Sequence, residues 1–108
     1  MHILLVEDNE TVASVSVDLL TPLGHSVPIA INGNQAMDAL KKEEGNFDAL
    51  VLDAMLPDMN CEKSVKGVRS LGYAGPIIIW TGAFESCPDN LNKKELAPIS
   101  VVLKGNPM

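Results

Sequence analysis

The feature that most constrains the fold of this chain is a short apolar run that ends on a carboxylate. Ala49 to Leu52 is wholly apolar, and Asp53 follows it directly. Such a run is typical of a strand that is buried on both faces of a parallel sheet. Pro57 then lacks the backbone donor that further sheet pairing requires. Asp53 is therefore predicted at the carboxyl end of a central strand, where open α/β sheets bind ligands.

Four other segments repeat this strand pattern, and helical patterns separate them. Strands are predicted at residues 3–6, 26–30, 76–80 and 99–103. Helices are predicted from an Asn9 N-cap to Leu20, from residue 33 or 34 onward, at residues 62–71 and, in short form, at residues 89–96. Proline cannot donate to a strand ladder, so Pro28 confines the second strand to an edge.

Alternating strands and helices predict an α/β fold. Right-handed crossovers and the edge position of the second strand favour a flavodoxin-like, doubly wound parallel sheet of five strands in the order 2-1-3-4-5. We expect residues 1–108 to form a single domain. No helical pattern follows the fifth strand, so we expect the fold to be truncated there.

The acidic composition argues against several classes of partner. The formal net charge is −6, whereas nucleic acids and anionic membranes are bound by basic surfaces. We therefore expect no direct contact with nucleic acid or membrane. Cys61 and Cys87 match no metal-ligand spacing and no disulfide framework, which predicts reduced thiols and a cytoplasmic location. No apolar stretch approaches the length of a membrane span.

Polar side chains stand where four of the predicted strands end: Glu7 and Asp8, Asp53, Thr81 and Lys104. The carboxyl ends of parallel strands share one edge, so these groups should converge. Neighbouring carboxylates repel unless a cation intervenes. A donor set made only of oxygens suits Mg²⁺ or Mn²⁺ and not zinc. Asp53 can attack phosphorus to form an aspartyl phosphate, while Thr81 and Lys104 can bind phosphoryl oxygens.

Together these segments resemble the receiver domain of two-component response regulators. The matching pieces are Ile3 to Asn9, Asp53 to Asp58, Trp80 to Gly82, and Lys104. The opening Val6 to Asn9, together with residues 23–27, 32–33 and 71–76, looks most like the receivers attached to hybrid sensor kinases or phosphorelays. The resemblance covers the chain from its first strand to its last and implies a phosphoacceptor signalling domain.

The resemblance also assigns roles to residues. Asp53 would be the phosphoacceptor. Asp8 would bind Mg²⁺ directly, Glu7 largely through water, and the Met55 backbone carbonyl would complete the protein ligands. Thr81 would move towards the phosphoryl group and Lys104 would pair with it. The implied partners are a histidine kinase or histidine phosphotransfer protein and a downstream protein effector; the domain is not a free-standing enzyme.

Three positions depart from the family pattern. Cys61 replaces a glycine, Gly105 replaces the proline after the lysine, and Val101 replaces an aromatic switch residue. Gly105, Val101 and the missing final helix support an alternative function, that of a pseudo-receiver that binds proteins or dimerises without being phosphorylated. Mg²⁺ affinity and phosphoryl uptake discriminate between the two functions.

The missing final helix has an expected energetic cost. If its absence exposes about 300 Å² of apolar sheet, the lost burial is worth roughly 7 kcal/mol. A whole domain is stable by only about 5–15 kcal/mol. We therefore expect a partner chain, a rearranged tail or an exposed apolar patch at this face, and a homodimer is one arrangement that covers it.

Overall fold

The computed structural model describes residues 1–53, 56–81 and 99–103. Its centre is a parallel sheet of five strands in the order β2-β1-β3-β4-β5. The strands are β1 Ile3–Val6, β2 Ile29–Ala30, β3 Ala49–Asp53, β4 Ile77–Thr81 and β5 Ile99–Leu103. The predicted strand order and the doubly wound fold class are confirmed.

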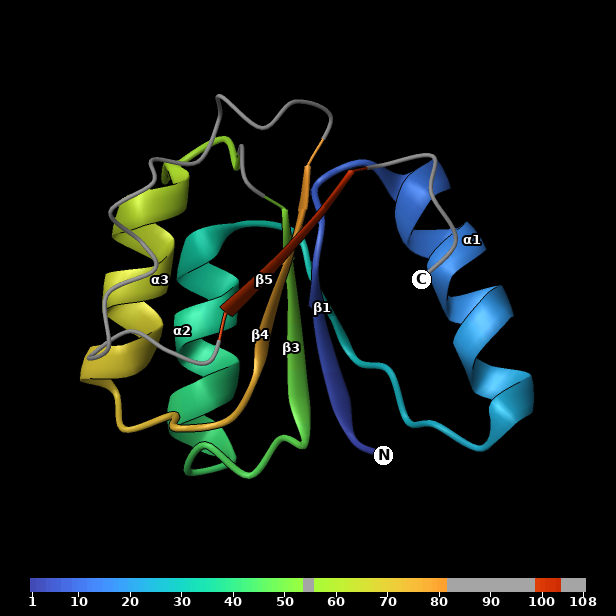
Figure 1. Cartoon of the computed structure of the whole chain (residues 1–108), viewed down its shortest axis with the longest axis horizontal. Coiled ribbons are helices and arrows are strands. Elements are labelled where there is room, and N and C mark those ends of the chain that lie inside the picture. Colours follow the sequence, from blue (N-terminus) through green and yellow to red (C-terminus); the bar gives the residue numbers. More distant parts are fainter. Residues whose placement is uncertain (54–55, 82–98, 104–108) are drawn as a thin grey trace.

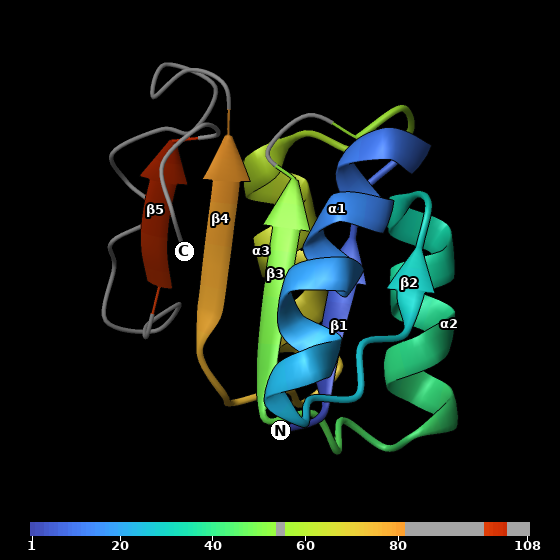
Figure 2. The ribbon, with the colours of Figure 1, turned by 90° about the vertical axis from the view of Figure 1, so that its right-hand side faces the viewer.

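Helices lie on both faces of this sheet. In the described part of the chain these are α1 Glu10–Leu20, a 3-10 turn at Thr21–Leu23, α2 Gly33–Lys42 and α3 Cys61–Ser70. Helix α1 covers one face, and α2 and α3 cover the other (Figures 1 and 2). None of these described helices combines the length and the apolar composition that crossing a bilayer requires.

Each of the three described α-helices begins after an asparagine. The side-chain oxygens of Asn9, Asn32 and Asn60 accept hydrogen bonds of 2.8 to 3.1 Å from the backbone N–H three residues later. An asparagine in this position satisfies one of the N–H groups that a helix leaves without an intrahelical partner. The predicted Asn9 N-cap is confirmed.

The apolar core has two layers, one on each face of the sheet. The larger layer lies under α2 and α3 and includes Leu50, Val65 and Ile79, while the smaller lies under α1 and includes Leu5 and Val51. All residues of β3 are buried. This burial on both faces is the physical reason for the continuous apolar run in the sequence.

The structure corrects the bounds of three predicted elements, of which β4 is shifted by one residue, to Ile77–Thr81 from the predicted 76–80. Strand β2 contains only Ile29 and Ala30, whereas Ser26 forms an isolated bridge with His2. Pro28 accepts a hydrogen bond from the Leu5 N–H at 3.0 Å but has no N–H with which to extend the ladder. Helix α3 begins one residue earlier than predicted because Asn60 caps it. The helix predicted at residues 89–96 lies outside the described ranges.

One prediction about the cysteines is wrong. Cys61 is fully buried at the first turn of α3 and is disulfide-bonded, so it is not a reduced thiol. Cys87 lies outside the described residues. The spacing of two cysteines in a chain does not reveal which residues the fold brings together, and the sequence carried no other signal for this bond.

Candidate functional site

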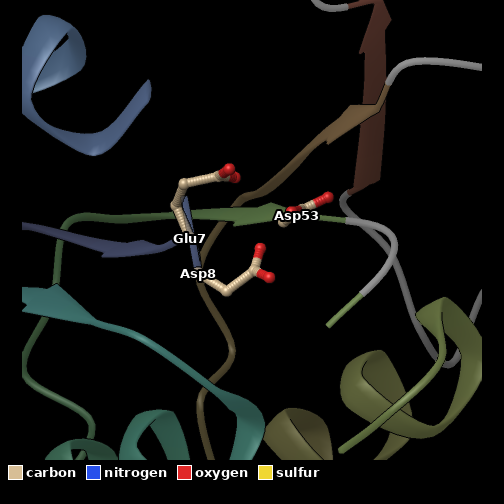
Figure 3. A group of neighbouring side chains, drawn as sticks. All are labelled: Glu7, Asp8 and Asp53. Atoms are coloured by element: carbon tan, nitrogen blue, oxygen red, sulfur yellow. The ribbon is translucent and has the colours of Figure 1, made fainter. Parts of the chain in front are cut away.

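The candidate site lies at the carboxyl ends of the two central strands. Glu7 and Asp8 follow β1, and Asp53 is the last residue of β3. These strands pair in parallel with Val6 opposite Leu52, so the three acids meet at one edge. One carboxylate oxygen from each lies within 4.8 Å of the others, and Figure 3 shows the three side chains around a common space. The predicted convergence of these acids is confirmed.

Local structure on β1 positions the first two acids. The Glu7 N–H donates to the Ala30 carbonyl at 2.9 Å, which extends the hydrogen bonding between β1 and β2 by one residue. Asn9 then caps α1. Asp8 is therefore confined between the end of a strand and the start of a helix.

Burial differs among the three carboxylates. Glu7 is 1 % exposed and Asp53 is 7 % exposed, whereas Asp8 is exposed. Two of the three carboxylates are thus shielded from solvent, and Asp8 is the exposed member of the cluster. Charges in such a setting interact more strongly than in bulk water.

The donor set fits a small divalent cation. All three side chains offer carboxylate oxygens, which are hard ligands. Two oxygens on opposite sides of a Mg²⁺ ion are about 4 Å apart, because each bond is about 2.0–2.1 Å long. A cluster whose members lie within 4.8 Å of one another can therefore share one ion, with water completing the coordination. Glu7, Asp8 and Asp53 are the residues that could hold it.

The other predicted site residues are described only in part. Thr81 ends β4, and Trp80 before it lies opposite Asp53 in the sheet, so the Thr81 backbone is at the same edge as the acids. Met55 and Lys104 lie outside the described residues. The roles assigned to Thr81, Met55 and Lys104 remain predictions.

Sequence reasoning missed Asp58. Its carboxylate accepts hydrogen bonds from the backbone N–H groups of Gly33 at 2.7 Å and Asn34 at 3.0 Å, at the start of α2. These bonds, that from Gly33 foremost, hold the pKa of Asp58 below its usual value. No local pattern marks a residue that binds the end of a different helix, because the contact spans 25 residues.

Comparison with known proteins agrees with this geometry. A family model described as "Response regulator receiver domain" matches residues 3–106. The chain belongs to the response regulator receiver domain family. This match confirms the resemblance that the strand-end residues carry, and receiver domains are signalling domains rather than classical enzymes.

Individual relatives have related names. YkoG of Bacillus subtilis (strain 168), described as an uncharacterized transcriptional regulatory protein, is 34 % identical over 103 residues, which is 95 % of this chain and 44 % of that protein. Probable histidine kinase 1 of Oryza sativa subsp. indica is 36 % identical over 73 residues, which is 68 % of this chain and 7 % of that protein. The chain thus spans less than half the length of these relatives.

A solved structure shows the same fold. The CheY-like receiver domain from Methylobacillus flagellatus superposes with a TM-score of 0.84 at 24 % identity, over 99 % of this chain and 88 % of that one. At this level of identity the likeness supports the fold alone. The chemistry of this chain is therefore inferred from its own site residues.

Proposed function

We propose that this receiver domain accepts a phosphoryl group from a phosphohistidine onto Asp53, in a reaction that depends on Mg²⁺ or Mn²⁺. The observation that carries the proposal is the convergence of the Glu7, Asp8 and Asp53 carboxylates within 4.8 Å. Asp53 is held at the end of a fully buried strand. A nucleophile fixed beside a cation site has the positioning and charge neutralisation that phosphoryl transfer needs.

The transfer exchanges one bond to phosphorus for another. A carboxylate oxygen of Asp53 forms a bond to phosphorus while the bond between phosphorus and the imidazole nitrogen of the donor breaks. The electron pair leaves with the imidazole, which takes its proton from solvent, and Asp53 becomes an acyl phosphate. Glu7, Asp8, Asp53 and the Met55 carbonyl would hold Mg²⁺, which when bound neutralises charge on the phosphoryl oxygens. Thr81 and Lys104 would bind those oxygens from the neighbouring strand ends.

The expected partners follow from this chemistry. The donor is a histidine kinase or a histidine phosphotransfer protein, in agreement with the name of the rice relative. The phosphoryl group adds negative charge at the edge shared by β1, β3 and β4. This charge would bias the conformations of the adjoining loops and present a changed surface to a downstream protein effector.

We also propose that a second copy of the domain covers part of the sheet. On the α1 face, Ile78 and Trp80 of β4 are only partly buried at the border of the smaller core layer. Figure 2 shows that α1 lies over β1 and β3 rather than over β4. Sedimentation velocity over a range of concentrations tests this proposal, and a monomer at every concentration would exclude it.

The decisive test of phosphoryl transfer is intact mass after incubation with acetyl phosphate and Mg²⁺. We expect wild type to gain the mass of one phosphoryl group, and Asp53→Asn to gain none. Asp38→Asn is the matched control, because Asp38 is exposed on α2 and lies outside the acidic cluster. Wild type that stays unmodified while binding Mg²⁺ weakly or not at all would support the pseudo-receiver instead.

A further inference from the structure

A groove of about 200 Å³ lies between α2 and α3. Its apolar lining comes from Met37 on α2, from Met59 before α3 and from Leu71 at the end of α3. The two methionines are half-buried, and Leu71 is exposed. Sites that bind a small molecule usually have volumes of about 300–1,000 Å³. The size and the lining of this groove therefore favour apolar side chains of another protein segment over a small ligand.

Gly67 of α3 also lines the groove. Glycine is unfavourable in the interior of a helix, but a Cβ atom at this position would come within 2.8 Å of Cε of Met37. The absence of a side chain at Gly67 therefore lets Met37 lie against α3. Methionine side chains are flexible and fill irregular gaps, so the lining of the groove can adjust to an inserted side chain.

Two lysines line the same groove, Lys41 of α2 and Lys63 of α3, and none of its described lining residues is acidic. Both lysines are exposed, and neither forms an ion pair with a described residue, whereas Lys66 pairs with Glu62 at 2.7 Å. Asp58 attracts Lys63 from beyond ion-pair distance, but its two oxygens already accept from backbone N–H groups of α2. An apolar groove with positive charge beside it is complementary to a segment that is apolar and acidic.

The solvent side of α1 has this complementary character. Val15 and Leu19 are 52 % and 62 % exposed, and residues four apart lie on one side of a helix. Asp18, next to Leu19, is exposed and forms no ion pair with a described residue. The chain contains no lysine or arginine before Lys41, so α1 presents apolar and acidic side chains without a basic one.

Helix α1 and the α2–α3 groove lie on opposite faces of the sheet (Figures 1 and 2), so one molecule cannot bring them together. We propose that α1 of one copy docks in the α2–α3 groove of a second copy, with Val15 and Leu19 against its methionines and Asp18 beside its lysines. Because the two surfaces differ, the contact is heterologous and can join further copies head to tail. The inference goes beyond the proposed function, since it requires neither the cation nor the phosphoryl group, and the contact is separate from the coverage of β4.

Sedimentation velocity of wild type and charge-reversed variants tests the contact, at concentrations up to about 1 mM, where weak complexes are populated. Lys41→Glu combined with Lys63→Glu reverses the charge of the groove, and Asp18→Lys reverses that of α1. We expect each to weaken self-association about tenfold, or about 1.4 kcal/mol, which two exposed ion pairs can supply. Lys42→Glu is the matched control, because Lys42 is exposed on α2 but does not line the groove, and it should associate as wild type does.

The direction of these effects separates the contact from general repulsion between acidic molecules. Asp18→Lys lowers the net negative charge of the chain, so reduced repulsion alone would strengthen association, whereas loss of the contact weakens it. Salt separates the two in the same way. An increase from about 0.05 M to about 0.5 M shortens the screening length, so it should weaken association of wild type. Stronger association in Asp18→Lys, or in wild type at high salt, would overturn the inference.

An equimolar mixture of the two charge-reversed proteins is the sharpest test. The groove variant keeps an intact α1, and Asp18→Lys keeps an intact groove, so the mixture should associate although each protein alone does not. Such recovery also shows that both variants fold, and a mixture that stays monomeric would contradict the contact. Association that is equal in wild type and in both variants would exclude the groove but leave the coverage of β4 standing. A wild type that is monomeric at every concentration would exclude both, whatever its uptake of phosphate.

Discussion

The substitution Asp8→Asn should make the metal-free domain more stable. An Asp8 carboxylate oxygen lies within 4.8 Å of oxygens of Glu7 and of Asp53. Two unit charges at that separation repel by about 0.9 kcal/mol in the dielectric of water, and by more in a drier pocket. Removing the charge of Asp8 relieves two such repulsions, so we expect the free energy of unfolding without metal to rise by about 2 kcal/mol.

Mg²⁺ should make wild type more stable than Asp8→Asn, which is the reverse of the order expected without metal. At 100 times the dissociation constant, a ligand that binds only the folded state adds about 2.7 kcal/mol to the free energy of unfolding. Wild type would gain this stabilisation, whereas Asp8→Asn lacks a directly binding carboxylate and would gain little. The variant is thus expected to be the more stable protein in EDTA and the less stable one in Mg²⁺. Urea unfolding followed by Trp80 fluorescence, at pH 7 with and without Mg²⁺, measures both differences.

Glu10→Gln is the control for a general effect of net charge. Glu10 is exposed in the first turn of α1 and is not a member of the cluster. The Glu10 carboxylate interacts favourably with the N-terminus of α1, so Glu10→Gln should lower the free energy of unfolding by about 0.3–1 kcal/mol in EDTA and in Mg²⁺ alike. The stabilisation by Mg²⁺ should be the same as in wild type. The electrostatic reasoning is refuted if Asp8→Asn is no more stable than wild type in EDTA, or if Mg²⁺ stabilises it as much as wild type.

Three further predictions concern other parts of the fold. The pKa of Asp58 is lowered in the folded state, so the free energy by which Asp58 stabilises the fold is present above its ordinary pKa of 3.8 and is lost as the pH falls through the folded-state pKa. Urea unfolding should therefore show that the difference in stability between wild type and Asp58→Ala disappears in acid. Arg69 donates hydrogen bonds to the carbonyls of Tyr73 at 2.9 Å and Gly75 at 2.6 Å. Arg69→Ala should therefore lower the free energy of unfolding by about 2 kcal/mol in the same assay. Leu19 is 62 % exposed on α1, and we expect it to contact a phosphohistidine donor protein. Leu19→Ser should then slow transfer from that protein but not from acetyl phosphate, and rate assays in which both transfers slow equally would exclude this contact.

The strands and their order were predictable because burial leaves a direct record in the sequence. Every residue of β3 is buried, which produced an uninterrupted apolar run ending on Asp53. Pro28 indicated an edge strand, and the structure agrees with the reason: its carbonyl accepts a hydrogen bond from the Leu5 N–H, but it has no N–H to donate. The convergence of the acids followed from parallel pairing alone. These inferences depend only on residues close together in sequence and on general rules of sheet topology.

The features that were not predictable depend on contacts between distant segments. From the sequence, Asp58 is expected to be a loop residue after Pro57, and none of its sequence neighbours indicates that it binds the start of α2. The disulfide bond at Cys61 is of the same kind. The start of α3 differs from the prediction by one residue for another reason, since its Asn60 cap is a local contact with the Lys63 N–H that the prediction did not use.

The site depends on the register between β1 and β3, and the two core layers explain why that register is specific. Leu4 and Leu50, which are opposite each other, face α2 and α3, while their neighbours Leu5 and Val51 face α1. Because side chains alternate along a strand, a slip of one residue would exchange the two faces and turn Asp53 away from Glu7. A slip of two would restore the faces but shift Asp53 by about 6.6 Å along the strand. That shift exceeds the 4.8 Å within which the carboxylate oxygens now lie, so the packing that selects one register also assembles the acidic cluster.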